Sequence, residues 1–236
     1  MFKGYLDHRS TPLWLAAALL VGCGNSPPPK AALLDSTPRA EKVDGGASYY
    51  EGEIGGMNED AVEDKFKRLS GRIGGCFESA MGRVEQIGGS FTVSFRVDRG
   101  GKPRWAYMVS STIGDRATEA CILDLVRSEV WPKPLSGEGL ASKTIEIEPS
   151  KAPHKLDDRR TKVAQNLARA RASSCKKGVN GAFMTTAYLE PDGRVRTVGV
   201  ATPNEKTETV AECIVTQLQK VRFAAPGKIA KITFQI

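Results

Sequence analysis

An internal repeat restricts the fold of this 236-residue chain more than any other feature. Residues 89–134 align without a gap with residues 181–226, which lie 92 positions further on. The aligned pairs are Gly89 and Gly181, Phe91 and Phe183, Gly101 and Gly193, Lys102 and Arg194, Arg104 and Arg196, Cys121 and Cys213, Ile122 and Ile214, Trp131 and Phe223, and Pro134 and Pro226. Upstream, Cys76 aligns with Cys175 if the second copy is seven residues shorter. One supersecondary unit has therefore been duplicated.

Each copy has the apolar spacing of two helices. The first helix of each copy is predicted from the stripes Val62, Phe66, Leu69, Ile73, Cys76 and Phe77, and Val163, Leu167, Ala168, Ala172 and Cys175. The second helices are predicted over residues 118–130 and 210–222. Their buried faces are predicted to contain Cys121, Ile122, Leu125 and Val126, and Cys213, Ile214, Leu218 and Val221.

Strict alternation of apolar residues predicts the strands. Residues 91–97 alternate, stop at a turn over residues 98–101 and resume from Pro103, which is the pattern of a β-hairpin. Copy two turns at residues 191–193, and each copy ends in a third strand. The predicted fold class is α+β, with two tandem modules of helix, strand, strand, helix and strand. Each module is expected to be a small antiparallel sheet with both helices on one face.

The amino terminus has the pattern of a bacterial lipoprotein export signal. Two cationic residues, Lys3 and Arg9, precede an apolar run over residues 12–22, about half of what a membrane-spanning helix needs. The run ends in Leu-Val-Gly-Cys, which resembles a lipobox that is cleaved before Cys23 and acylated on its sulfur. The alternative is an incidental thiol at an ordinary cleavage site. We expect residues 1–22 to be a signal peptide and Cys23 to carry a lipid anchor.

The segment after the lipobox is rich in proline, glycine, serine and alanine. We expect residues 23–59 to contain the acylated cysteine and a disordered linker, followed by modules at residues 60–149 and 155–236. Such a linker spans typically about 30 to 35 Å, so the modules can work away from the lipid surface. Gly24 stands where an aspartate retains lipoproteins at the inner membrane, which favours the periplasmic face of the outer membrane.

The remaining four cysteines lie one on each predicted helix. Helices on the same face of a sheet can bring their cysteines together, and the periplasm is oxidising. Of the three pairings that four cysteines allow, we expect Cys76 with Cys121 and Cys175 with Cys213. Four unpaired, buried thiols are the alternative.

Short motifs accompany this order of elements. Gly88 and Gly89 precede the first strand, Val-Ser-Ser follows the second at residues 109–111, and Val-Trp-Pro ends the second helix at residues 130–132. Together these residues resemble the TonB C-terminal domain and, still more, the myxobacterial AgmX/PglI C-terminal domain family, whose modules carry one cysteine in each helix. The resemblance covers about residues 62–149 and, more faintly, 160–236.

The resemblance implies a domain that grips an extended segment of an envelope protein beside a sheet edge. The chain departs from the family because an uncleaved transmembrane anchor is lacking, which favours binding over energy transduction. Strand addition would use the third strands, at residues 143–148 or 231–236. The predicted partner-binding residues are Lys143, Thr144, Ile145, Ile232, Phe234 and Ile236.

The two copies differ in charge, within a chain whose net charge is +7. Residues 60–150 hold 13 basic and 13 acidic side chains, whereas residues 151–236 hold 16 basic and 7 acidic ones. The excess predicts a surface for an anionic partner, and a solubilising face is the alternative. The predicted anion-binding residues are Arg159, Arg160, Lys162, Arg169, Arg194 and Arg196.

Catalytic constellations are absent from the sequence. Two histidines, His8 and His154, leave little material for acid/base or zinc chemistry, and the paired serines have no histidine placed to activate them. We expect a protein that is not an enzyme, with no cofactor, no metal and no small-molecule substrate. Export removes the chain from nucleic acid, so we expect no nucleic-acid partner.

The combined expectation is a lipid-anchored binding or scaffolding component of a bacterial envelope machine, of the motility or transport kind. Its partner would be an envelope protein bound by strand addition. The alternative is a structural tether between the outer membrane and the cell wall, or an anionic envelope polymer, through the basic second copy.

Overall fold

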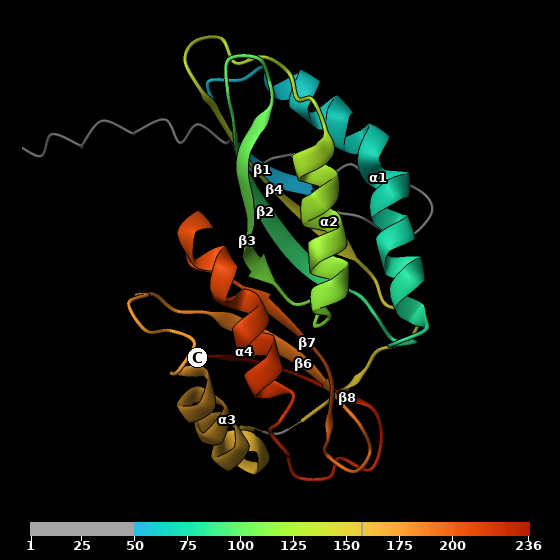
Figure 1. Cartoon of the computed structure of the whole chain (residues 1–236). Coiled ribbons are helices and arrows are strands. Elements are labelled where there is room, and N and C mark those ends of the chain that lie inside the picture. Colours follow the sequence, from blue (N-terminus) through green and yellow to red (C-terminus); the bar gives the residue numbers. More distant parts are fainter. Residues whose placement is uncertain (1–49, 157) are drawn as a thin grey trace, which may run out of the picture. The chain divides into compact units, whose positions relative to one another are not determined.

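The computed structural model describes residues 50–156 and 158–236, which belong to one compact unit. The predicted signal peptide, Cys23 and the linker before Tyr50 lie outside the described residues. The described chain is α+β, with four α-helices and two sheets (Figure 1). The predicted fold class is confirmed at this level.

The first sheet has the strand order β1-β4-β2-β3, and every pairing in it is antiparallel. Its strands are β1 (Tyr50–Gly55), β2 (Gly89–Val97), β3 (Pro103–Ser111) and β4 (Gly139–Ile147). The hairpin of β2 and β3 forms where strict alternation predicted it. β1 falls in the segment predicted to be linker, so the prediction of a linker up to residue 59 is wrong from Tyr50 onward.

Two helices of the first copy lie on one face of this sheet (Figure 1). They are α1 (Glu59–Met81) and α2 (Arg116–Ser128). Asn58 and Asp115 cap their first turns by accepting hydrogen bonds from backbone N–H groups. The stripe predicted for the first helix, from Val62 to Phe77, is buried throughout.

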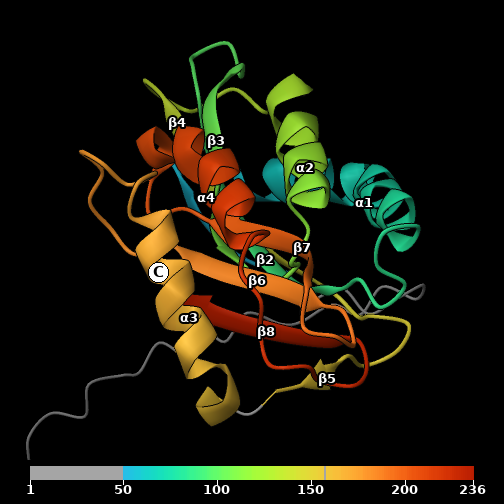
Figure 2. The ribbon, with the colours of Figure 1, turned by 60° about the horizontal axis from the view of Figure 1, so that its bottom comes forward.

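The second sheet has the strand order β5-β8-β6-β7. Its strands are β5 (His154–Lys155), β6 (Met184–Leu189), β7 (Val195–Ala201) and β8 (Ala230–Gln235). The short β5 is parallel to β8, and the other pairings are antiparallel. Helices α3 (Asp158–Ala172) and α4 (Ala211–Leu218) cover one face of this sheet (Figure 2), and a 3-10 helix, η1 (Glu205–Val210), precedes α4.

The buried face of α3 differs from the prediction. Val163 is 83% exposed and Leu167 is 44% exposed, whereas Thr161, Ala168 and Ala172 are buried. The two large apolar residues point outward because the helix packs through its small side chains. The prediction was wrong for Val163 and Leu167 and right for the two alanines.

The alignment of the two copies is confirmed at their hairpin turns. Gly101 and Gly193 both have left-handed backbones, with φ of 83° and 85°. The carbonyl of Gly101 accepts from the N–H of Trp131, and that of Gly193 from the N–H of Phe223, each at 2.9 Å. The same loop therefore returns to the same turn in each copy.

Both predicted disulfides are present. Cys76 on α1 is joined to Cys121 on α2, and Cys175, three residues after α3, is joined to Cys213 on α4. Each bond therefore ties the helical layer of one copy together. By the loop-entropy model each contributes about 4 kcal/mol to the free energy of unfolding.

Candidate functional site

β4 is an interior strand, so the prediction that its residues form an open edge is wrong. β1 pairs with one side of β4 and β2 with the other. Ile145 is buried in the core, and the ammonium of Lys143 forms an ion pair with Glu63 of α1. The hydroxyl of Thr144 is hydrogen-bonded to Thr92 at 2.8 Å. Residues 50–55, interpreted as linker, supply the strand that covers this edge.

β8 is different, because only its first two residues have a strand on the outer side. β5 pairs with Ala230 and Lys231, and within the described residues no strand covers β8 on this side beyond Lys231. The side chains of Ile232 and Phe234 are buried in the core of the second copy. The edge from Ile232 to Ile236 therefore has backbone groups available for pairing with another strand, while its apolar side chains pack in the core.

The pairing with β6 determines which backbone groups face outward. Ile236 and Phe183 exchange two backbone hydrogen bonds, of 2.9 and 3.2 Å, and such pairs alternate along an antiparallel ladder. Phe234 and Ile232 consequently direct their N–H and C=O groups toward β6. Thr233 and Gln235 direct theirs to the open side.

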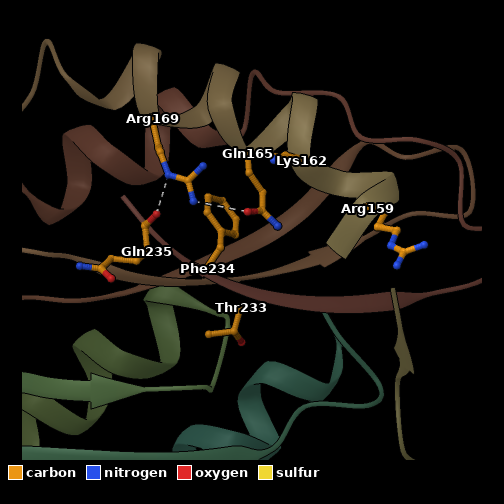
Figure 3. Close-up of a pocket in the computed structure, with 7 residues that line it drawn as sticks. All are labelled: Arg159, Lys162, Gln165, Arg169, Thr233, Phe234 and Gln235. Carbon is orange, nitrogen blue, oxygen red and sulfur yellow. Dashed lines mark hydrogen bonds between the residues drawn. The ribbon is translucent and has the colours of Figure 1, made fainter. Parts of the chain in front are cut away.

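Arg169 of α3 is hydrogen-bonded to one of these outward-facing backbone groups. Its Nε donates a hydrogen bond of 2.9 Å to the backbone carbonyl of Gln235, and a terminal nitrogen donates to the amide oxygen of Gln165 at 3.4 Å (Figure 3). Arg169 is thus bonded to a backbone carbonyl that a neighbouring strand would otherwise use.

An open pocket of about 510 Å³ lies between α3 and the β8 edge. It is lined by Arg159, Lys162, Gln165, Arg169, Thr233, Phe234 and Gln235. In Figure 3 the side chain of Phe234 lies beneath α3, between the helix and the strand. The structure therefore brings three predicted anion-binding residues next to a predicted partner-binding strand. Gln165, Thr233 and Gln235 were missed, because sequence spacing alone does not align α3 with β8.

The other predicted anion-binding residues lie elsewhere. Arg160 is exposed on α3 and is not among the residues that line the pocket. Arg194 precedes β7 and pairs with Asp192 at 2.8 Å, while Arg196 in β7 lies 3.5 Å from a carboxylate oxygen of Glu190. Because β7 is the last strand of the sheet on the side away from β8, these arginines do not join the cluster on α3.

A buried carboxylate at the contact between the copies was also missed. Glu119 of α2 is fully buried and accepts hydrogen bonds from Ser111 Oγ at 2.5 Å and from the backbone N–H of Val200 at 2.8 Å. Burial raises the pKa of this carboxyl to about 7, against the opposing effect of both hydrogen bonds and of Arg116. Its spacing from Ile122 and Val126 placed it on the buried stripe, and that signal could have identified it.

A second open pocket, of about 400 Å³, lies between α2 and α4. Its charged side chains are largely paired with one another: Arg83 with Asp115 at 2.6 Å, and Arg116 with Glu212 at 2.7 Å. These pairs stabilise the contact between the copies, so this pocket is a weaker candidate for a ligand site than the one beside β8.

Comparisons with family models, with curated proteins and with solved structures find no match to this chain. Of the helices within residues 50–156 and 158–236, none is both long and apolar enough to cross a membrane. In the same ranges, histidine, cysteine and acidic side chains do not gather in a group of three that could hold a metal ion.

Proposed function

We propose that this protein is a lipid-anchored binding or scaffolding component of a bacterial envelope machine, and that it binds an extended segment of an envelope protein by strand addition to β8. The observation that carries this proposal is the open edge from Ile232 to Ile236, where Thr233 and Gln235 direct backbone groups away from β6. An uncovered strand edge is a template for pairing with another chain.

Export and anchoring are supported by separate features. Two disulfides are typical of proteins that fold in an oxidising compartment. The lipobox-like motif ending at Cys23 supports attachment to a membrane, and Gly24 supports the outer membrane. Within this proposal the periplasmic face of the outer membrane holds the anchor, and the folded copies reach partners from there.

The relationship to the TonB C-terminal and AgmX/PglI families belongs to the same proposal. It is supported by the helix, strand, strand, helix, strand order that follows β1 and β5, and by one disulfide in each copy. A role in binding, not catalysis, is supported by the chemistry of the described pocket lining beside β8. That lining consists of cationic, amide, hydroxyl and phenyl side chains, which suit an anionic or peptide ligand.

The experiment that tests strand addition compares two equivalent positions in the native envelope. Gln235 lies opposite Met184 on the open edge, and Thr144 lies opposite Thr92 in the covered strand. A photo-crosslinking amino acid is placed at one position or the other in the membrane-anchored protein, and the adducts are mapped by mass spectrometry. The proposal predicts adducts from position 235, on one segment of one envelope protein, and few from position 144.

The same experiment distinguishes the second candidate, a tether to the cell wall or to an anionic envelope polymer. This candidate is favoured by Arg159, Lys162 and Arg169, which surround the pocket. Glycan or lipid adducts from position 235, without a protein segment, would assign the site to the tether. Equal labelling from both positions would refute the use of the β8 edge.

A further inference from the structure

The first copy shows how an extended segment occupies the edge that is open in the second copy. β1 pairs antiparallel with β4 from Tyr50 opposite Ile145 to Gly55 opposite Leu140. In the second copy, β5 occupies the same side of β8 but pairs with only Ala230 and Lys231. The two copies therefore present one edge in two states, covered and largely uncovered.

The registers of the two sheets identify the uncovered positions. Ala141 lies opposite Phe95, and Ile232 lies opposite Ala187, which is 92 positions after Phe95. By the same correspondence Gln235 is equivalent to Thr144, which β1 pairs with Glu51. The uncovered stretch from Ile232 to Ile236 thus corresponds residue by residue to residues 141–145 of β4, all of which β1 covers.

The helices beside these edges differ in charge at their first turns. With Cys76 aligned on Cys175, Glu63 of α1 corresponds to Lys162 of α3, 99 positions later. The first two turns of α1 also carry Glu59, Asp60 and Asp64 together with Lys65, whereas α3 begins with Asp158 and continues with Arg159 and Arg160. In the first copy a mainly acidic helix start lies beside the covered edge, and in the second copy a mainly basic helix lies beside the open one.

The strand residue that faces this charged helix position also differs between the copies. Glu63 pairs with Lys143 of β4. The equivalent of Lys143 in β8 is Phe234, because each lies opposite the same position of the preceding strand in its copy. β8 therefore supplies no carboxylate for Lys162, which is exposed and lines the pocket. An incoming segment with acidic side chains would supply it.

A strand that binds to β8 would also change the hydrogen bonding of Arg169. A strand that pairs with β8 as β1 pairs with β4 takes over the carbonyl of Gln235, to which Arg169 now donates. The displaced guanidinium then lies beside the new strand and can bind a carboxylate on it. Binding of an acidic segment exchanges one hydrogen bond of Arg169 to a neutral carbonyl for one to a carboxylate, in which both partners are charged.

We propose that the open part of β8 binds an acidic, extended segment of a partner protein, antiparallel to β8 and in the register that β1 takes on β4. This inference rests on the proposed function, since it uses the same edge, and it adds the charge and the direction of the ligand.

The test uses the mature full-length protein in detergent micelles and labelled, capped peptides in a binding titration. One peptide alternates threonine with glutamate, a second alternates threonine with lysine, and a third is the glutamate peptide with alternate backbone nitrogens methylated. The acidic peptide is expected to bind at least about tenfold more tightly than the basic one, and methylation is expected to abolish binding. Lys162→Glu should weaken acidic-peptide binding several-fold, whereas Arg160→Glu, the same charge change outside the pocket, should have a much smaller effect.

The other outcomes show whether the acidic ligand alone fails or whether strand addition fails with it. If acidic and basic peptides bind equally and methylation abolishes binding of the acidic one, strand addition stands and the acidic ligand is refuted. If the methylated acidic peptide binds as well as the unmethylated one, the site recognises anionic polymers and both proposals fail. No binding of any peptide refutes both as well. A doubled mass of the free protein in sedimentation, dispersed by the acidic peptide, would assign the edge to a second copy of this chain and overturn the partner segment.

Discussion

The carboxylate of Glu119 in the first copy accepts a hydrogen bond of 2.8 Å from the backbone N–H of Val200 in the second. The contact is continued by Thr197, whose hydroxyl donates to the carbonyl of Gly114, and by Tyr188, whose hydroxyl donates to the carbonyl of Gln86, each at 2.8 Å. Tyr188 is fully buried and packs in the core of the first copy. The two copies therefore share buried structure, and their stabilities are coupled.

Glu119 makes this coupling dependent on pH. Because burial raises its pKa to about 7, the folded protein holds a proton that the unfolded chain has already lost above its ordinary pKa of 4.5. The stability contributed by this proton is present at low pH and is lost as the pH rises from about 5 to about 7. We expect the free energy of unfolding, from urea titrations, to fall over this range in the native protein and to fall less in Glu119→Gln.

The neighbours of Glu119 define the control. Arg116 of α2 opposes the rise in its pKa and Glu208 of η1 adds to it, while Ser111 and Val200 donate to the carboxylate. Glu212 pairs with the same Arg116, but its side chain is 69% exposed. Glu212→Gln should therefore leave the slope between about pH 5 and pH 7 unchanged. An identical slope in Glu119→Gln and the native protein would contradict the assignment.

Two glycines in the hairpin turns are expected to be irreplaceable for a shared reason. A Cβ on Gly101 would lie 2.1 Å from the carbonyl oxygen of Trp131, and a Cβ on Gly193 would lie 2.1 Å from that of Phe223. Both residues also have positive φ, which alone costs a residue with a side chain about 1 to 2 kcal/mol. Alanine at either position should lower the free energy of unfolding by more than that amount.

Gly137 separates the two causes of that loss. Its φ is +64°, yet no atom of the described part of the chain lies within 4 Å of a Cβ built on it. Gly137→Ala should therefore show the conformational cost alone, about 1 kcal/mol. Chemical denaturation of the three variants checks the expectation, and equal losses at all three positions would show that the close approach to the carbonyls has no energetic consequence.

Predictions from sequence were most accurate where one physical signal dominates. Alternation placed β2, β3 and β8, and the repeat placed Gly101 and Gly193 in equivalent turns. β1 was missed because residues 50–55 have the glycine content of a linker and become a strand only by pairing with β4. That pairing is a long-range contact, and it also determines which third strand remains open.

The face of α3 was misread for a different reason. Hydrophobicity favoured Val163 and Leu167, but the helix packs through smaller residues. Aligning Cys76 with Cys175 places the buried Leu69 on Ala168 and Ile73 on Ala172, and so identifies the buried face. The pocket beside β8 could not be predicted in this way, since it depends on how a helix and a strand some seventy positions apart come together.

The two disulfides should differ in their accessibility to reductant. Their sequence separations, 45 and 38 residues, are similar, so their effects on loop entropy are similar too. Cys76 is only 3% exposed, whereas Cys213 belongs to the exposed residues of α4. Under native conditions a mild reductant should open Cys175–Cys213 first, as detected by alkylation and mass spectrometry. Simultaneous opening of both bonds would indicate that reduction requires global unfolding.

The packing of α3 through alanines gives a final prediction. Ala168 is fully buried, so Ala168→Leu must force the helix away from the sheet and should lower the free energy of unfolding by about 1 to 3 kcal/mol. Leu167, the adjacent residue, is 44% exposed, and Leu167→Ala should cost at most about 1 kcal/mol, because it removes little buried surface and alanine favours the helix. Thermal and urea denaturation measure both variants. The reverse order of effects would place Leu167 in the core and return α3 to the orientation that its hydrophobic residues suggest.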